Sequence, residues 1–134
     1  MQLREVVNRG VEVAAPAAAL RDAAQKMAAF NVALLPVCER KRVIGTLTDH
    51  DITVRATAKG RDPNKTKVAE VMTTDFVTCF DDQDVVEAAR LMADKQIRLL
   101  IVVDRNNRLV GVVSLTDLVL HTVGEVSAGE ADEV

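Results

Sequence analysis

The sequence pattern of the first half of the chain is repeated in the second half. The run Leu3–Val7 reappears as Val68–Met72, displaced by 65 residues. After a polar turn that is one residue longer in the second copy the displacement becomes 66, so that Val43–Thr48 corresponds to Leu109–Ser114. A duplicated fold tolerates a one-residue insertion best in a surface turn. The sequence therefore predicts two copies of one structural unit.

Each copy predicts the same order of elements: a short strand, an amphipathic helix, two strands joined by a tight turn, and a closing helix. The closing helices are expected to begin at about Asp49 and Thr116. This order defines an α+β (mixed α/β) fold built from two β-α-β-β-α units. The expected strands are Val11–Ala14, Ala33–Cys38 and Val43–Thr48 in the first copy, and Phe76–Phe80, Leu99–Val103 and Leu109–Ser114 in the second. The expected core faces of the helices are Leu20, Ala23, Ala24 and Met27, and Val85, Ala88, Ala89 and Met92.

The boundaries follow from composition. Residues 1–60 are expected to form the first repeat and 68–123 the second, with 61–67 as the linker. The stretch Gly60–Lys65 is rich in residues that end helices and form turns. Residues 124–134 are acidic and small, and a disordered tail is expected there.

Composition restricts the class of protein. Hydrophobic residues make up 49% of the chain, yet it has no Trp or Tyr and only three Phe, so the core must be aliphatic. The formal net charge is −3, with 17 Lys plus Arg against 20 Asp plus Glu, which argues against a nucleic-acid binder. No apolar run is long enough to span a bilayer, and the first residues lack a signal-peptide layout.

Two cysteines, Cys38 and Cys79, lie in strand-like stretches with no Cys or His at ligand spacing beside them. They are interpreted as buried structural thiols, with a disulfide or a shared metal as the unsupported alternative. Unpaired thiols favour a reducing compartment, and the expected location is the cytoplasm.

One short motif occurs once in each copy, at the end of the last strand. It reads glycine, any residue, hydrophobic, Ser or Thr, and then Asp three positions later, at Gly45–Asp51 and Gly111–Asp117. A hydroxyl at a strand end and a carboxylate in the next helical turn face one cleft, where Asp suits a ribose diol and the hydroxyl suits a phosphate. The alternative is purely structural: Ser or Thr followed by an acid three residues later is a helix capping box.

The duplicated pattern resembles a pair of cystathionine-β-synthase (CBS) domains, also called a Bateman module. The resemblance covers about residues 1–123 and is carried by the two strand-end motifs, each placed after a matching helix and two strands. The region around Asp51 and Asp62 looks like stand-alone bacterial CBS pairs of signalling proteins, in which Arg is usual where His50 stands here. The resemblance implies two units related by a pseudo-twofold axis and two ligand clefts.

In the family, each cleft takes its hydroxyl and carboxylate from one repeat and an adenine-lining wall from the first strand of the other. For the first cleft, the resemblance implies Thr48 and Asp51, with Thr73, Phe76 and Val77 along the wall. For the second cleft, it implies Ser114 and Asp117, with Val7 and Val11 along the wall.

The two clefts are expected to be unequal. Family members that hold AMP often carry a basic residue before the second strand; Arg98 has that place in the second copy and Ala33 in the first. Ser114, Asp117 and Arg98 are therefore favoured as the phosphate-binding set, with a solvated strand-edge charge as the alternative for Arg98. For His50 two roles are considered: contact with a ligand phosphate, or a position on a solvated helix face.

No nucleophile with a base partner, metal cluster or Gly-rich phosphate loop is visible, which predicts that the chain is not an enzyme. The predicted function is a regulatory sensor that binds an adenosyl ligand between the repeats, AMP ahead of ATP, NAD or S-adenosylmethionine. It needs no cofactor or metal, and it signals through a homodimer or an unidentified regulated protein, with no nucleic acid or membrane as partner. The alternative is a constitutive interaction module whose clefts are vestigial.

Overall fold

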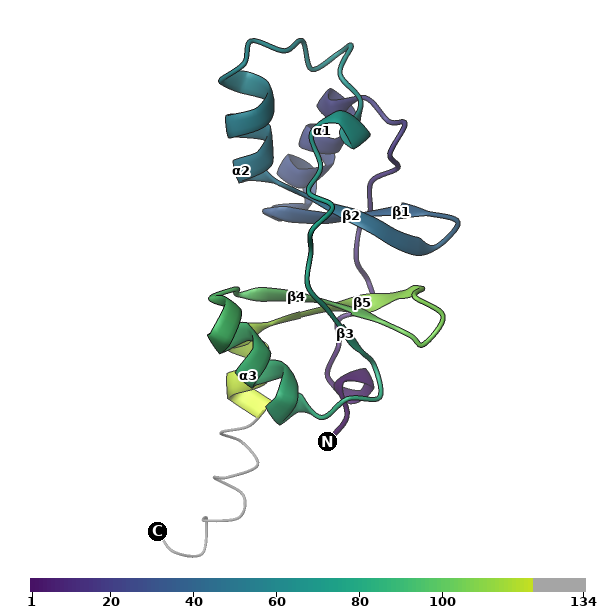
Figure 1. Cartoon of the computed structure of the whole chain (residues 1–134), viewed down its shortest axis with the longest axis vertical. Helices are drawn as coiled ribbons and strands as arrows, with labels where there is room; N and C mark the ends of the chain where they lie inside the picture. Colours follow the sequence, from purple (N-terminus) through teal and green to yellow (C-terminus); the bar gives the residue numbers. More distant parts are fainter. Residues whose placement is uncertain (122–134) are drawn as a thin grey trace, which may run out of the picture. The chain divides into compact units, whose positions relative to one another are not determined.

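The computed structural model describes residues 1–121 and divides the chain into two compact units (Figure 1). The central unit is Glu12–Phe76, and the terminal unit joins Met1–Val11 to the chain from Val77 onward. The first residues of each repeat therefore belong to the compact unit of the other repeat. The tail predicted at 124–134 lies outside the described residues.

The central unit places two helical segments on one face of a two-stranded sheet (Figure 1). Strands β1 (Leu34–Glu39) and β2 (Arg42–Thr48) pair antiparallel, and α1 (Leu20–Phe30) packs against β1. After β2 the chain forms α2 (Asp49–Asp51), the π-helix η2 (Ile52–Thr57) and the 3-10 helix η3 (Val68–Glu70). The aliphatic core of this unit includes Leu20, Ala23, Met27, Leu35, Val37, Leu47, Val68 and Val71.

The terminal unit repeats this arrangement with one more strand. β3 (Thr78–Phe80) pairs parallel with β4 (Leu99–Val103), which pairs antiparallel with β5 (Leu109–Ser114). The helices are η1 (Leu3–Glu5), α3 (Val85–Lys95) and a helix over residues 115–121. The buried positions include Leu3, Cys79, Val85, Ala88, Met92, Leu100, Val102, Val113 and Leu118.

The duplication is confirmed in the strand registers. The β1–β2 pairing slips between Val37 and Cys38, and the β4–β5 pairing slips between Val102 and Val103, which are the corresponding positions. The predicted bounds of β4 and β5 are confirmed, while β1 begins and ends one residue later than predicted and β2 begins one residue earlier. Three of the four predicted core positions on each of α1 and α3 are buried, and Ala24 and Ala89 are half-buried.

The strand predicted at Val11–Ala14 was wrong, and the one predicted at Phe76–Phe80 is shorter than expected. Ala14 makes only an isolated parallel bridge to Val37, whereas its counterpart Cys79 is the middle residue of β3 and pairs with Val102. The cause lies two residues further on, where the first copy has Pro16 and the second has Asp81. The Asp81 N–H donates to the Val103 carbonyl at 2.9 Å, and proline has no N–H with which to extend the pairing.

Each exchanged segment is fixed to its sheet by a pair of reciprocal backbone hydrogen bonds. In the central unit, Thr46 and Thr73 exchange N–H to carbonyl bonds of 2.9 and 2.8 Å. In the terminal unit, Asn8 and Val112 exchange bonds of 2.8 and 3.0 Å. The motif glycine precedes each sheet residue, and a side chain there would collide with the incoming segment. A Cβ at Gly111 would overlap the carbonyl oxygen of Asn8 and lie 2.8 Å from Cγ2 of Val7.

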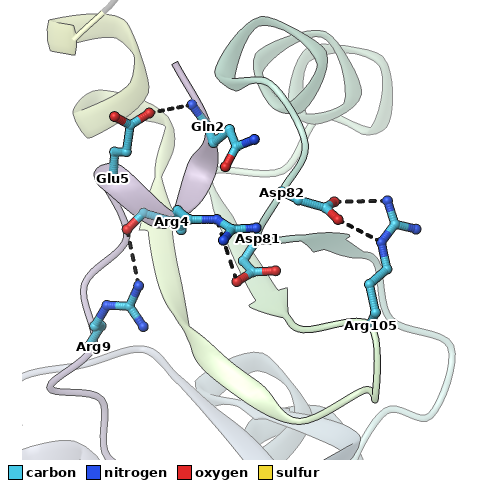
Figure 2. A network of polar contacts seen from close by, with 7 residues as sticks. All are labelled: Gln2, Arg4, Glu5, Arg9, Asp81, Asp82 and Arg105. Carbon is cyan, nitrogen blue, oxygen red and sulfur yellow. Dashed lines mark hydrogen bonds and ion pairs between the residues drawn. The ribbon is translucent and has the colours of Figure 1, made fainter.

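A polar network also ties the N-terminal segment to the loop before α3 (Figure 2). The N–H of Arg4 donates to the Asp81 carbonyl at 2.9 Å, and its guanidinium lies 3.9 Å from the Asp81 carboxylate. Asp82 of the same loop accepts two hydrogen bonds, of 2.9 and 2.8 Å, from Arg105 in the turn between β4 and β5, and the Arg105 guanidinium stacks over the ring of Phe80. The hydrogen bond from Arg105 holds the pKa of Asp82 below its usual range.

The close approach at Gly111 predicts that replacing three glycines by alanine lowers stability to different degrees. Gly111→Ala should lower the free energy of unfolding by about 3 kcal/mol, because the new Cβ meets main chain. Gly45→Ala should cost about 1 kcal/mol, because its closest neighbour is the thioether of Met72, which is adaptable. Gly10→Ala is the control: its nearest neighbour would lie 3.8 Å away, so a change within about 0.5 kcal/mol is expected. Urea unfolding measures all three, and equal losses would contradict the close approach at Gly111.

Candidate ligand-binding sites

In the central unit, the strand-end motif forms a helix cap. The Asp51 N–H donates to Oγ1 of Thr48 at 3.1 Å, and the Thr48 N–H donates back to Oδ2 of Asp51 at 3.0 Å. This reciprocal pair is the capping box that the sequence left open as the structural alternative. One carboxylate oxygen of Asp51 is therefore used to start the helix.

The second carboxylate oxygen of Asp51 is also occupied. The hydroxyl of Thr73 donates to Oδ1 of Asp51 at 2.9 Å, and only 5% of Asp51 is exposed. Thr73 was predicted to line the wall of this same cleft, and it arrives there on the segment exchanged from the second repeat. The two oxygens that were expected to accept from a ligand thus both accept from the protein.

In the terminal unit, the corresponding motif makes only one of the two capping hydrogen bonds. The Asp117 N–H donates to Oγ of Ser114 at 3.0 Å, which caps the helix over residues 115–121. Asp117 itself is exposed, and among the hydrogen bonds of the described residues none reaches its carboxylate. The residue that corresponds to Thr73 is Asn8, whose Oδ1 accepts from the N–H of Gly10 at 3.1 Å instead. The Asp117 carboxylate is consequently available to a ligand.

Arg98 contacts the strand-end motif of Asp117 through its backbone. Its carbonyl accepts the N–H of Leu115 at 2.8 Å, so its backbone touches the residue that follows Ser114. The Arg98 side chain is exposed, and within residues 1–121 no ion pair or hydrogen bond involves its guanidinium. At the corresponding place in the central unit, the Ala33 carbonyl accepts the N–H of Asp49 at 3.1 Å, so the backbone is the same and the cation is absent.

The wall residues fall into both units. Val7 and Val77 are half-buried against the core of the terminal unit, and Val11 is half-buried at the end of its N-terminal segment. Phe76 is half-buried at the end of the central unit, and the boundary between the units follows it. Val77 therefore belongs to the terminal unit, whereas Asp51 belongs to the central one. His50 is exposed, and its backbone N–H donates to Oδ1 of Asp49 at 2.8 Å.

Arg55 has a role that its position in the sequence did not reveal. From η2 its guanidinium donates to the carbonyls of Met72 at 3.0 Å and of Val71 at 3.4 Å. It therefore anchors the exchanged segment immediately before Thr73. The π-helical geometry of η2 has no signature in the sequence, whereas the described part of the corresponding segment, residues 118–121, belongs to an α-helix.

The two cysteines are unpaired thiols. Cys79 is buried and Cys38 is half-buried, and burial raises the pKa of Cys38 to about 11. Burial also raises the pKa of Cys79, with the charge of Glu87 acting in the same direction. Both side chains are therefore protonated and poorly nucleophilic at neutral pH.

Two further features of the described part of the chain bear on its chemistry. Within residues 1–121, no three His, Cys, Asp or Glu side chains gather closely enough to hold a metal ion. No helix in this part of the chain has the length and apolar character needed to cross a membrane.

Two units that exchange their first segments, each with a strand-end hydroxyl and a carboxylate three residues later, define a CBS domain pair. The family model of the CBS domain matches the chain twice, at residues 3–56 and 68–124. The chain therefore belongs to the CBS domain family and carries two copies of the domain.

Curated relatives extend over nearly the whole chain. The CBS domain-containing protein YhcV of Bacillus subtilis is 40% identical over 129 residues, covering 96% of this chain and 91% of the relative. Hypoxic response protein 1 of Mycobacterium tuberculosis is 31% identical over 119 residues, covering 88% of this chain and 82% of the relative.

Solved structures share the fold. The crystal structure of Hypoxic Response Protein I with two coordinated zinc ions has a TM-score of 0.81 at 30% identity, covering 90% of this chain and 98% of that one. The CBS domain pair of protein MJ0100, in complex with 5′-methylthioadenosine and S-adenosyl-L-methionine, has a TM-score of 0.77 at 25% identity, covering 93% and 98%.

The difference between the two carboxylates predicts different effects on stability. Asp51→Ala should lower the free energy of unfolding by about 2 kcal/mol, because it leaves the Thr73 hydroxyl and the Thr48 N–H without their buried acceptor. Asp117→Ala should cost about 0.5 kcal/mol, because it removes only an exposed charge in the first helical turn. Thermal and urea unfolding of both variants measure this difference, and equal losses would contradict the buried hydrogen bonds of Asp51.

Proposed function

We propose that this CBS domain pair is an adenine-nucleotide sensor whose main ligand site is in the terminal unit. The proposed site consists of Ser114, Asp117 and Arg98, with Val7 and Val11 as apolar neighbours. The observation that carries the proposal is that Asp117 and Arg98 are both exposed, and that the Arg98 backbone bonds to Leu115 within the motif of Asp117.

The chemistry of this set suits a nucleoside with a phosphate. The two oxygens of Asp117 can accept from the two hydroxyls of a ribose, as carboxylates do in dinucleotide sites. The hydroxyl of Ser114 and the guanidinium of Arg98 can donate to phosphate oxygens. The MJ0100 pair, bound to two adenosyl compounds, supports this ligand class, and a cation at residue 98 favours AMP over an adenosyl ligand without phosphate.

The proposed output is a change in contacts between chains. Exposed apolar side chains occur on helical segments of both units: Phe30 and Val54 in the central unit, and Val86, Val119 and Leu120 in the terminal unit. Leu120 is 64% exposed, and in the central unit a hollow of about 300 Å³ lies between α1 and η2. We propose that these faces form a homodimer or receive a regulated protein. A ligand then signals by binding one arrangement more tightly than another.

We propose no catalytic step and no required cofactor for the chain. The protonated, unpaired thiols of Cys38 and Cys79 favour a reducing compartment, and we propose the cytoplasm as its location.

A second candidate is a constitutive interaction module with vestigial sites. One observation favours it: both oxygens of Asp51 are used inside the central unit, so that site is closed as it stands. The two candidates differ in what they predict for Asp117.

AMP binding tests the proposal. At 100 times its dissociation constant, AMP should stabilise the native protein by about 2.7 kcal/mol, and Asp117→Ala should greatly reduce this shift. Asp94→Ala, which removes another exposed acid of the same unit, is the control and should leave binding unchanged. Calorimetry with AMP, ADP, ATP, NAD and S-adenosylmethionine ranks the ligands. If none of them binds, the interaction module is the better account.

Arg98→Ala separates phosphate recognition from adenosine recognition. Loss of a charge-assisted hydrogen bond should weaken AMP about tenfold or more, while the affinity for adenosine should stay the same. Calorimetric titration of wild type and variant with both compounds measures the difference. An equal loss for AMP and adenosine would assign Arg98 a structural role instead.

The dimer has its own test. Leu120→Glu combined with Val86→Glu should shift the protein toward monomer in sedimentation velocity, because charges enter the apolar face. Thr116→Glu places the same charge on an exposed polar position of the same helix and should leave the sedimentation coefficient unchanged. A wild-type protein that sediments as a monomer at all concentrations would remove the dimer and leave the regulated protein as the output.

A further inference from the structure

In the central unit, a hydroxyl group of the protein itself occupies the Asp51 carboxylate. The Thr73 hydroxyl donates to Oδ1 of Asp51 at 2.9 Å, at a carboxylate that is only 5% exposed. Donation of a hydroxyl hydrogen to one carboxylate oxygen is also the interaction that a ribose hydroxyl would make at this place. At a carboxylate with so little exposed surface, the Thr73 hydroxyl and a ribose hydroxyl therefore compete for access to Oδ1.

The backbone delivers the Thr73 hydroxyl to this position and holds it there. The N–H and carbonyl of Thr73 are both bonded to Thr46, at 2.8 and 2.9 Å. Arg55 holds the preceding carbonyls of Met72 and Val71 from η2. The hydroxyl can leave Asp51 only by rotation about χ1, which is a stiff torsion in a β-branched residue.

The terminal unit has the same backbone and lacks the competitor. Asn8 makes the same reciprocal bonds, to Val112, but its side-chain oxygen accepts from Gly10 and the Asp117 carboxylate stays exposed. The contrast isolates one side chain, at the position of Thr73 and Asn8, as the difference between a closed and an open carboxylate.

We infer that Thr73 is an intramolecular competitor that determines ligand occupancy, so that AMP fills the Asp117 site first and the Asp51 site only after the Thr73 hydroxyl is displaced. This inference rests on the proposed function, because it presupposes that the Asp117 site binds AMP. Displacing one hydrogen bond to a charged group corresponds to about a tenfold or greater loss of affinity at the Asp51 site.

The test is calorimetric titration of the full chain with AMP. Wild type should show one tight equivalent, and any second equivalent should be at least tenfold weaker. Thr73→Val removes the hydroxyl at nearly constant shape and should tighten the second equivalent by about tenfold or more. Thr73→Ser keeps the hydroxyl and should behave as wild type, and Thr74→Val alters an exposed neighbouring threonine as the matched control.

The double variant Thr73→Val, Asp117→Ala isolates the central unit. It should bind one equivalent of AMP more tightly than Asp117→Ala alone. Should Thr73→Val fail to fold, Thr73→Ala replaces it. The order in which AMP fills the two sites of the wild-type protein can be measured without any variant.

The outcomes separate this inference from the proposed function. Two equal tight sites in wild type, or a Thr73→Val protein that fills like wild type, would overturn the role of Thr73 while leaving the sensor in place. Absence of AMP binding in wild type and in every variant would overturn both.

Discussion

The structure depends on one backbone contact that occurs twice: a segment from one repeat lies against the sheet of the other at a glycine. Thr73 meets Thr46 beside Gly45, and Asn8 meets Val112 beside Gly111. Only a residue without a side chain permits this approach, because at Gly111 a methyl group would occupy the position of the Asn8 carbonyl. The same contact places the residue that faces the motif carboxylate. Fold and site therefore rest on one constraint, and the glycine of the strand-end motif belongs to the packing while its hydroxyl and carboxylate belong to the site.

Most of the elements could be predicted because the same pattern of residues occurs in both repeats. Where the two copies agree, as for the β4–β5 hairpin and the buried positions of α1 and α3, pattern and turn residues sufficed. Pro16 shows where the agreement failed, since one imino acid removes a donor and ends a pairing that its counterpart Asp81 continues. The exchange of segments could not be predicted from the residues alone: Leu3–Val7 and Val68–Met72 are so alike that nothing in them specifies which sheet each one joins.

The site was predicted as a set of residue types and not as a set of hydrogen bonds. Asp51 and Asp117 look equivalent in the sequence. Their difference arises from Thr73, which lies 22 residues away and donates to Asp51, whereas the corresponding Asn8 accepts from Gly10 instead. Arg55 was equally hidden, because its hydrogen bond to the Met72 carbonyl joins residues 17 positions apart in the chain. A duplicated fold thus keeps its backbone in both copies while single side chains make the two sites different.

The exchange of first segments also has a consequence for the covalent chain. A single repeat cut at the linker would carry a sheet whose Thr46 or Val112 backbone groups lack their partners, together with a loose segment that fits another copy. Two such halves satisfy each other only by trading segments, as in a domain-swapped dimer. Joining them through residues 61–67 turns an encounter between molecules into one within a molecule, at an effective concentration set by the linker. The peptide link between the repeats is thus itself a stabilising element, because it makes the pairing of the two halves independent of how much protein is present.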